Sequence, residues 1–541
     1  MVKTKKAGTL LLASALTVAL AACSGGNNNG GNSASGSATA PASGASSASA
    51  SADAGKPDTS KFVTVNYVIL GDKPKNGQFE KVLAKVNELL KAKVNAQIEW
   101  KWVEWADWQT KYNLLLASGE QLDLITVGTD WLDTWSNAQR GAFLPLSDDM
   151  LKTYAPQTYA NVKPEEWAQT KYDGKVVILP ENQFTQWVNH GFIYRGDWAK
   201  EAGLPDKLTS WDEIEKYLQY IKDNKPDVVP FDVAAGGSLN MIWDGWDQSF
   251  TKNLPLPVTS GFLPMFYAKS YDEPYTAVSP IFDDTFMNYV KKMKEWADKG
   301  FWREDVLNNK VDITTQLEAG LTGLMSHHTS QFSGLRPTMD KKQPGSDLQF
   351  FPFARPNQNL MATSITHGGT SIGAHSKNPE RALMVYDLLR NDKEIYDLIN
   401  YGIEGTQYEI KDNKRVLPAG YDETRDAFYS DFWGGRNDKL EIPSDQTWDK
   451  IDTLYQEYDS YKKPYIYGQF VFDKSKVQAE LAAISQVSSQ MGPSLSFGQM
   501  KDPEKAVQDF RDKLKQAGYD KVMAELQRQL DDYKKLIESQ Q

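Results

Sequence analysis

The fold class is decided by the segment VTVNYVIL at residues 63–70, whose β-branched, aromatic and aliphatic residues predict a β-strand. Apolar residues recur at helical spacing over residues 79–94, which predicts an amphipathic helix. Residues 96–102 alternate apolar and polar, as a second strand would. A second helix that stops at Gly119 and a short apolar strand at residues 122–126 complete a βαβαβ pattern. The pattern predicts an open parallel sheet with helices on both faces.

The rest of the chain predicts a second α/β region without an internal repeat. Strand-like runs occupy residues 176–180 and 191–195, and both are expected in a second sheet. Helices are expected at residues 197–202, 211–224, 287–299, 378–389, 502–518 and 521–537.

The N-terminus has the pattern of an export signal. Lysines at positions 3, 5 and 6 precede an apolar stretch from residue 7 to 22, which is slightly short for a membrane span. Cys23, the single cysteine of the chain, follows Leu20-Ala21-Ala22 directly. This arrangement resembles the lipobox of bacterial lipoproteins, in which the signal (here residues 1–22) is removed and the cysteine sulfur carries a diacylglycerol. The alternative is an ordinary secretory signal with an incidental cysteine.

Residues 23–60 form a predicted disordered tether. Residues 24–55 are almost wholly Ser, Ala, Gly and Asn, which offer too little apolar side chain to offset the entropy of ordering. A flexible coil of this length has an r.m.s. reach of roughly 35 Å. The alternative is a spacer that passes through a cell wall. It would have the same composition, so the sequence leaves both open.

Charge and aromatic content narrow the class of ligand. The formal net charge is −11, which disfavours nucleic acid and anionic lipid as partners. The chain holds 16 tryptophans, several of them next to acids, amides and glycines. Such neighbours suggest flat apolar platforms in a polar binding site.

From about residue 61 to the end, the chain resembles the extracellular solute-binding lipoproteins that serve carbohydrate ABC importers, in particular the larger oligosaccharide-type relatives of maltose-binding protein. No single motif is specific, but their order along the chain is. The matching segments are LASGE (116–120) with DLI (123–125), GAFLPL (141–146), DGKV (173–176), IYRGDW (193–198), SKNPERA (376–382), YGIEG (401–405) and residues 467–485.

The resemblance implies a two-lobed periplasmic-binding-protein-like (type II) α/β fold with hinge strands and a central cleft that closes on ligand. The first lobe is expected to comprise residues 61–180 with 363–408. The second would comprise residues 181–362 with 409–541. Hinge crossings are expected near residues 178–181 and 353–356.

Asp130 and Trp131 are the foremost candidates for ligand binding. They follow the third predicted strand, and open α/β sheets bind ligands beyond the carboxyl ends of their strands. By resemblance, Asp130 falls where maltose-type relatives place a carboxylate that accepts hydrogen bonds from sugar hydroxyls. The alternative is a helix-capping Asp beside a core Trp.

Further candidates lie at predicted cleft edges, each with packing or capping as its alternative explanation. They are Trp187, Asn189, His190, Trp243, Asp244, Trp246, His327, His328, Gln331, Glu404, Trp433 and Arg436.

Catalytic and metal sites receive less support. The segment Gly369-Thr370-Ser371-Ile372-Gly373 matches a nucleophile elbow, but no helix follows the serine directly, so a strand is predicted. Asp244 and Asp247 are spaced as a glycosidase pair could be. Scattered histidines, with neither a zinc motif nor a calcium loop, predict no metal and no cofactor.

These observations predict a monomeric, non-enzymatic receptor, lipid-anchored on the extracytoplasmic face of the cell membrane. It would capture a carbohydrate, an oligosaccharide of two to five units, and pass it to ABC transporter permease subunits. The alternatives are a surface-anchored glycan hydrolase and a peptide-binding receptor.

Overall fold

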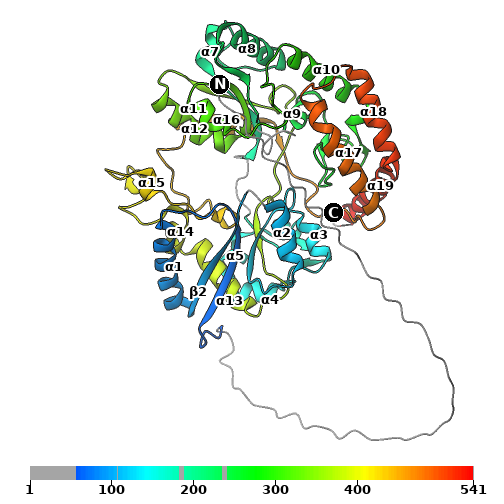
Figure 1. Cartoon of the computed structure of the whole chain (residues 1–541). Coiled ribbons are helices and arrows are strands. Elements are labelled where there is room, and N and C mark those ends of the chain that lie inside the picture. The colour runs from blue at the N-terminus through cyan, green and yellow to red at the C-terminus, as the bar shows by residue number, and fades with distance from the viewer. Residues whose placement is uncertain (1–56, 106–107, 182–187, 234–240, 540–541) are drawn as a thin grey trace, which may run out of the picture. The chain divides into compact units, whose positions relative to one another are not determined.

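The computed structural model describes residues 57–539 apart from 106–107, 182–187 and 234–240 (Figure 1). The signal, Cys23 and most of the predicted tether lie outside the described residues. Among the helices of the described part, none has both the length and the apolar character needed to cross a bilayer.

The first lobe is built on a five-stranded sheet in the order β2-β1-β3-β15-β6. Its strands are β1 (Val63–Leu70), β2 (Ala96–Val103), β3 (Leu124–Val127), β6 (Leu179–Pro180) and β15 (Gly369–Ser371). The predicted βαβαβ unit is confirmed, because β1 pairs in parallel with β2 and β3. The sheet is not parallel throughout, however, since β15 runs antiparallel to both β3 and β6.

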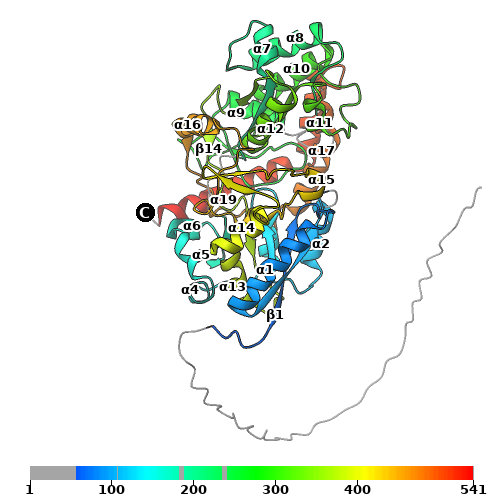
Figure 2. The same cartoon turned by 90° about the vertical axis from the view of Figure 1, so that its left-hand side faces the viewer.

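Helices of the first lobe cover this sheet and bury its apolar side chains. They are α1 (Gln78–Val94), α2 (Trp108–Ala117), α3 (Thr134–Gln139), α4 (Asp148–Tyr154), α5 (Pro156–Asn161), α6 (Pro164–Ala168), α13 (Pro379–Asn391) and α14 (Lys393–Tyr401). In α1 the buried side chains include Phe79, Val82, Val86 and Leu90, which repeat at helical spacing. Figure 2 shows α1 beside α13, the helix after the returning strand.

The second lobe is built on a four-stranded sheet in the order β13-β7-β12-β8. Its strands are β7 (His190–Arg195), β8 (Val229–Phe231), β12 (Thr322–His328) and β13 (Leu348–Pro352). Aromatic side chains fill its core, and Phe192 contacts the rings of Trp211, Phe231 and Phe353 at 4.8–5.4 Å between centroids. The predicted strand at residues 176–180 does not join this sheet, because Leu179 and Pro180 pair with β15 in the first lobe.

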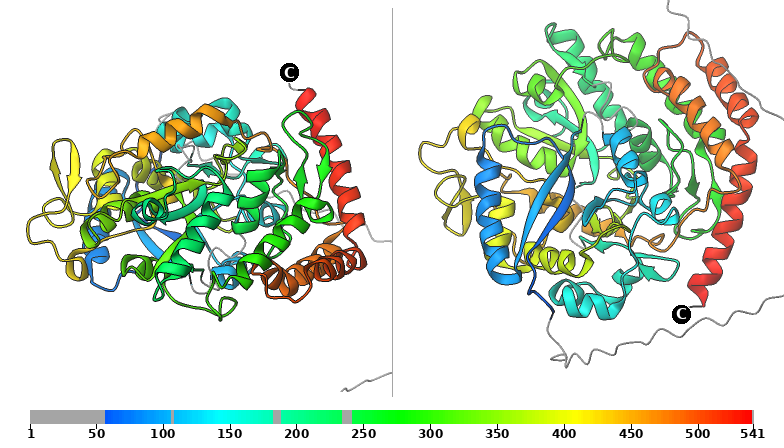
Figure 3. Two further views of the ribbon diagram at one scale, coloured as in Figure 1. Left: turned by 90° about the horizontal axis from the view of Figure 1, so that it is seen from above. Right: turned by 60° about the horizontal axis from the view of Figure 1, so that its bottom comes forward.

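Helices of the second lobe include a C-terminal group that wraps its edge. The helices are α7 (Gly196–Glu201), α8 (Trp211–Asn224), α9 (Met241–Phe250), α10 (Asp284–Asp298), α11 (Ile313–Glu318), α12 (Thr329–Lys342), α16 (Ile451–Tyr461), α17 (Gln478–Ser496), α18 (Pro503–Gln516) and α19 (Tyr519–Glu538). Helices α17 and α18 pack against α10, and α19 packs against α17 and α18 (Figures 1 and 3).

Short ribbons and turns complete the described structure. They are β4 (Lys171–Tyr172) with β5 (Lys175–Val176), β9 (Leu254–Pro255) with β10 (Tyr267–Ala268) and β11 (Ala277–Val278), β14 (Leu360–Met361) with β18 (Lys462–Lys463), β16 (Glu409–Lys411) with β17 (Lys414–Val416), α15 (Glu423–Asp426), and 3₁₀ turns at Pro280–Phe282 and Phe432–Gly435.

The chain leaves the first sheet after β6, enters the second sheet at β7, and returns to the first sheet between β14 and β15. The second crossing lies later than the expected 353–356, because Phe353 packs in the core of the second lobe. Phe432 packs in the core of the first lobe, which favours a later boundary than residue 408 for the returning segment.

A buried ion pair ties the end of β8 to the segment after α10. The Asp232 side chain is fully buried and accepts two hydrogen bonds from Arg303, at 2.8 and 2.6 Å from Nε and Nη2. Thr322 Oγ1 donates a third at 3.0 Å. The three donors satisfy a charge that would otherwise be costly to bury.

We expect Asp232→Ala to lower the free energy of unfolding by roughly 3 kcal/mol, because it leaves Arg303 unpaired in a partly buried position. Urea denaturation of the chain without its signal measures the change. Asp509→Ala, which removes an exposed pair with Lys505, is the control and should cost less than about 0.5 kcal/mol. Equal effects of the two changes would contradict the assignment.

Candidate functional site

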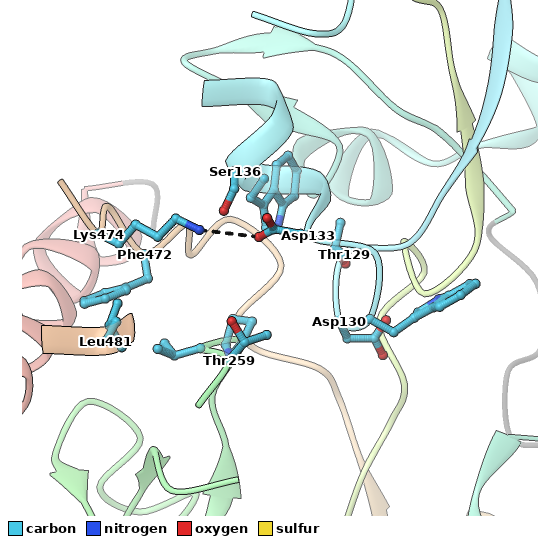
Figure 4. A pocket seen from close by; sticks show the side chains of 12 residues that line it. Thr129, Asp130, Asp133, Ser136, Thr259, Phe472, Lys474 and Leu481 are labelled. Carbon is cyan, nitrogen blue, oxygen red and sulfur yellow. Dashed lines mark ion pairs between the residues drawn. The ribbon is translucent and has the colours of Figure 1, made fainter. Parts of the chain in front are cut away.

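Two adjoining cavities lie where the lobes meet. The main cavity has a volume of about 310 Å³ and takes polar groups from both lobes, including Asp130, Asn189, His190, Asp244 and His367. The side cavity, of about 50 Å³, shares Asp130. Its lining also comes from Thr129, Trp131 and the start of α3 on one lobe, and from residues 257–259, the segment before α17 and Leu481 on the other (Figure 4). A ligand in either cavity would contact both lobes.

Asp130 lies on the loop after β3, as predicted, and is paired with a histidine from a distant part of the chain. His367 Nδ1 donates to Asp130 Oδ2 at 2.8 Å. Burial alone would lower the pKa of His367, but the Asp130 carboxylate outweighs it and raises that pKa to about 9. Conversely, burial would raise the pKa of Asp130, and the charge of His367 holds it below its usual value. Near neutral pH both groups are therefore ionised.

Backbone contacts hold the Asp130 loop against the segment that carries His367. Thr129 N donates to Thr366 O at 2.9 Å, and the Thr134 hydroxyl both accepts from Gly128 N at 3.0 Å and donates to Gly128 O at 2.8 Å. A Cβ at Gly128 would lie 2.2 Å from Trp131 Nε1, so only glycine fits this close approach.

Trp131 is half-buried and lies in a group of aromatic rings. Its indole N–H donates to His367 O at 2.8 Å, which fixes the plane of the ring. Trp105, Trp108 and Trp433 surround it with centroids at 6.2, 5.6 and 5.4 Å. Such a rigid aromatic group is suited to present a flat apolar surface to a ligand.

The wall from the second lobe is formed by residues at the start of β7. Asn189 and His190 line the main cavity, and His190 pairs with His328 in the β7–β12 register. Burial lowers the pKa of His190 to about 3, and the pKa of His327 to about 4. These imidazoles are therefore neutral near pH 7 and can both donate and accept hydrogen bonds.

Helix α9 presents one acid to the main cavity and packs its tryptophans behind it. Asp244 and Gln248 both line the cavity, one turn apart on the same helical face. Tyr267 Oη donates to Asp244 at 3.3 Å, and burial raises the pKa of this carboxyl to about 7. Trp243 is fully buried with its N–H bonded to Pro264 O at 2.9 Å, and Trp246 is 7% exposed.

The predicted site residues therefore divide into those at the two cavities, one outside the described residues, and those with other contacts. Asp130, Trp131, Asn189, His190 and Asp244 line one or both cavities, and Trp433 packs against Trp131. Trp187 lies outside the described residues.

The remaining candidates line neither cavity, and other contacts account for their positions; that they bind ligand stays a prediction. Trp243 and Trp246 belong to the core of the second lobe. His328 Nδ1 accepts from Gln331 N and so caps α12, while Nδ1 of His327 accepts from the next backbone N–H. These two histidines and Gln331 line neither cavity.

Glu404 and Arg436 also lie away from both cavities. Glu404 is exposed in the turn that bridges to Tyr408. Arg436 forms ion pairs with Asp438 at 2.8 Å and Glu441 at 3.8 Å.

Sequence reasoning missed several groups that line the main cavity, chiefly His367, Gln248, Phe353 and Tyr458. His367 lies two residues before the Gly369–Gly373 motif, in a segment without any pattern typical of a binding site. The sequence gives no local signal that it meets Asp130, which lies 237 residues earlier.

The geometry does not support the catalytic alternatives. Ser371 is fully buried in β15 and donates to Val177 O at 2.7 Å, as expected of a strand. Asp247 is 2% exposed, accepts from Asn253 at 2.9 Å and does not line the main cavity beside Asp244. Among the described residues, no group of three His, Cys, Asp or Glu side chains is placed to hold a metal ion.

We expect the thermal midpoint of His367→Gln to fall below that of the wild type by an amount that depends on pH. Because folding raises the pKa of His367 from 6.5 to about 9, its stabilising contribution is complete below pH 6.5 and is lost as the pH rises through 9. Protonation of Asp130 also removes the pair, but only at a pH below the ordinary aspartate pKa of 3.8, because the charge of His367 holds the pKa of Asp130 lower. Thermal melts from pH 4 to 10 measure the difference.

The exposed His375 provides a matched control, and His375→Gln should follow the wild-type curve at every pH. A constant difference between wild type and His367→Gln across the range would contradict an ionised pair.

Comparisons with known proteins agree with this geometry. A carbohydrate ABC transporter substrate-binding protein of Streptococcus pneumoniae is 25% identical over 473 residues, which cover 86% of this chain and 90% of that protein. Lipoprotein LipO of Bacillus subtilis is 26% identical over 58% of this chain and 62% of its own length.

Solved structures share the fold. The N-glycan transport solute binding protein (NgtS) from Streptococcus pneumoniae superposes with a TM-score of 0.69 at 22% identity, over 87% of this chain and 99% of that one. The alginate-binding protein AlgQ2 gives a TM-score of 0.64 at 19% identity, over 87% and 98%. The expected two-lobed fold is confirmed.

Two family models match the chain. Residues 466–535 match a domain of unknown function (DUF3502), which here covers α17, α18 and most of α19. Residues 74–394 match the model described as bacterial extracellular solute-binding protein, which spans more than half of the chain. The chain therefore belongs to the bacterial extracellular solute-binding proteins, a family of receptors rather than enzymes.

Proposed function

We propose that this protein captures an oligosaccharide in the main cavity and delivers it to the permease of an ABC transporter. The main cavity itself is the observation that carries the proposal. It joins hydrogen-bonding groups of both lobes, and Asp130 connects it to the aromatic group around Trp131. Carboxylate, amide and imidazole groups match the hydroxyls of a sugar, and an indole face matches its C–H face.

The relatives support a sugar as the ligand. One is named a carbohydrate ABC transporter substrate-binding protein, and NgtS has been solved in complex with the glycans Man1GlcNAc and Man5GlcNAc. A ligand that contacts both lobes favours the arrangement in which the lobes lie close together, so capture and closure are one equilibrium.

A thermal-shift screen against mono- and oligosaccharides tests the proposal. A binding glycan at a hundredfold excess over its Kd stabilises the protein by about 2.7 kcal/mol. Stabilisation by peptides alone would favour a peptide receptor, and release of reducing ends from the same glycans would favour a hydrolase.

We expect Trp131→Ala to weaken binding of the glycan found in that screen by about tenfold or more, since it removes an aromatic face from the side cavity. Isothermal titration calorimetry measures the Kd, and circular dichroism checks that the protein remains folded. Trp448→Ala is the matched control, because Trp448 is also half-buried but packs against Phe332 away from both cavities. Equal affinities of the two variants would remove Trp131 from the site.

We further propose that Cys23 carries the lipid anchor and that residues 24–60 tether the lobes to the outer face of the membrane. Two or more acyl chains are needed for stable anchoring, and a lipidated N-terminal cysteine supplies them. The relative named lipoprotein LipO supports this assignment.

Cys23→Ser should abolish labelling by palmitate and move the protein from the membrane fraction to the soluble or secreted fraction. Fractionation of expressing cells after metabolic labelling measures both. Ser24→Ala, at the neighbouring position, is the control and should leave labelling intact. Retained labelling of the Cys23→Ser protein would contradict the lipid assignment.

A further inference from the structure

The cations that line the two cavities are matched by carboxylates of the protein. Asp130 pairs with His367 at 2.8 Å in the main cavity. In the side cavity Asp133 lies 3.7 Å from Lys474, the ion pair drawn in Figure 4, and 3.8 Å from Arg140. Each cation that lines a cavity therefore already faces a carboxylate.

Within the described residues, neither lysine nor arginine lines the main cavity. The two undescribed segments nearest in sequence to its lining residues, 182–187 (NQFTQW) and 234–240 (AAGGSLN), contain no charged residue. The cavity's other ionisable groups are His190, whose pKa burial lowers to about 3, Asp244, whose pKa burial raises to about 7, and Tyr458, whose pKa burial raises so that its phenol is neutral. The main cavity thus carries between zero and one net negative charge near neutral pH.

From this charge balance we infer that the main cavity selects uncharged oligosaccharides and discriminates against sugars that carry a carboxylate. The inference rests on the proposed function and specifies its class of substrate. A carboxylate in this cavity would lose hydration without gaining an unpaired cation, and it would lie near the acids Asp130 and Asp244.

The remaining polar lining suits neutral hydroxyl groups. Asn189 and Gln248 carry amides that both donate and accept, as a hydroxyl does. Neutral His190 has the same dual capacity. An amide or a neutral imidazole can form hydrogen bonds with a sugar hydroxyl in which the donor and the acceptor are both uncharged.

The test compares three forms of one glycan: the neutral oligosaccharide, the same glycan with one primary hydroxyl oxidised to a carboxylate, and the methyl ester of that acid. Calorimetry at pH 7.5 with the full chain lacking its signal gives each Kd. We expect the carboxylate to bind at least about tenfold more weakly than the neutral glycan. The ester, similar in size but uncharged, should recover most of the affinity.

Two variants probe the charges directly. Asp244→Asn removes the acid that has no cationic partner. It should therefore bring the Kd of the carboxylate form closer to the Kd of the neutral glycan. Adding Gln248→Lys to that variant introduces an unpaired cation on the same helical face and should narrow the ratio of the two Kd values further or reverse it. The ratio is the readout because a general loss of folding would weaken both glycans alike.

Carboxylate binding equal to or tighter than that of the neutral glycan would overturn the inference while leaving the proposed function in place. An ester as weak as the acid would also overturn it, since size rather than charge would then govern selection. Binding of none of the three forms, with no glycan active in the wider screen, would overturn the proposed function itself.

Discussion

The position of β15 (Gly369–Ser371) between β3 and β6 is the constraint on which the site depends. The strand arrives from the second lobe and pairs antiparallel with β3 over three residues, so the segment just before it must run beside the loop just after β3. This register places Thr366 against Thr129 and His367 against Asp130. Without the inserted strand, the acid after β3 would face solvent alone.

The same register explains why Trp131 is held so firmly. Its N–H bonds to the backbone oxygen of His367, while the ring of His367 bonds to Asp130. One histidine thus fixes both the acid and the aromatic ring that neighbours it. Positioning of this kind would reduce the entropy lost on binding of a ligand to Asp130 and Trp131, because both side chains are already held in place.

Much of the first lobe could be predicted from the sequence because its signals are local. The strand at residues 63–70, the helix after it and the strand at residues 96–102 each have a clear period, and the structure has all three. Placement of Asp130 beyond the carboxyl end of β3 followed from the general geometry of α/β sheets.

The site could be predicted only in part because it forms from distant segments. In the sequence, residues 243–247 form what looks like a single cluster of ligand-binding aromatic and acidic residues. In the structure this segment belongs to α9, an amphipathic helix with Asp244 at the main cavity and Trp243 and Trp246 in the core. Pairing of His367 with Asp130 depends on strand order, which no local pattern encodes. The sequence indicated the residue types, and the helical face decided which of these side chains line the main cavity.

The lobes also touch directly, through side chains on α3 and the segment before α17. Gln139 Nε2 donates to Asp473 Oδ1 at 2.9 Å, and Lys474 lies 3.7 Å from Asp133. Gln529 of α19 holds the backbone of Asp473 on the side of the second lobe through bonds to its N–H and its carbonyl. Exposed contacts of this kind contribute about 1 kcal/mol or less each.

These weak contacts have a consequence for a receptor that must both close and reopen. Two such contacts alone bias the closed arrangement by no more than about 2 kcal/mol, a factor of roughly thirty. A sugar that bonds to Asp130 on one lobe and to Asn189 and Asp244 on the other adds several hydrogen bonds that exist only when the lobes are together. Under the proposed function, the ligand would therefore determine whether the lobes are closed, and its release would require only that these bonds break.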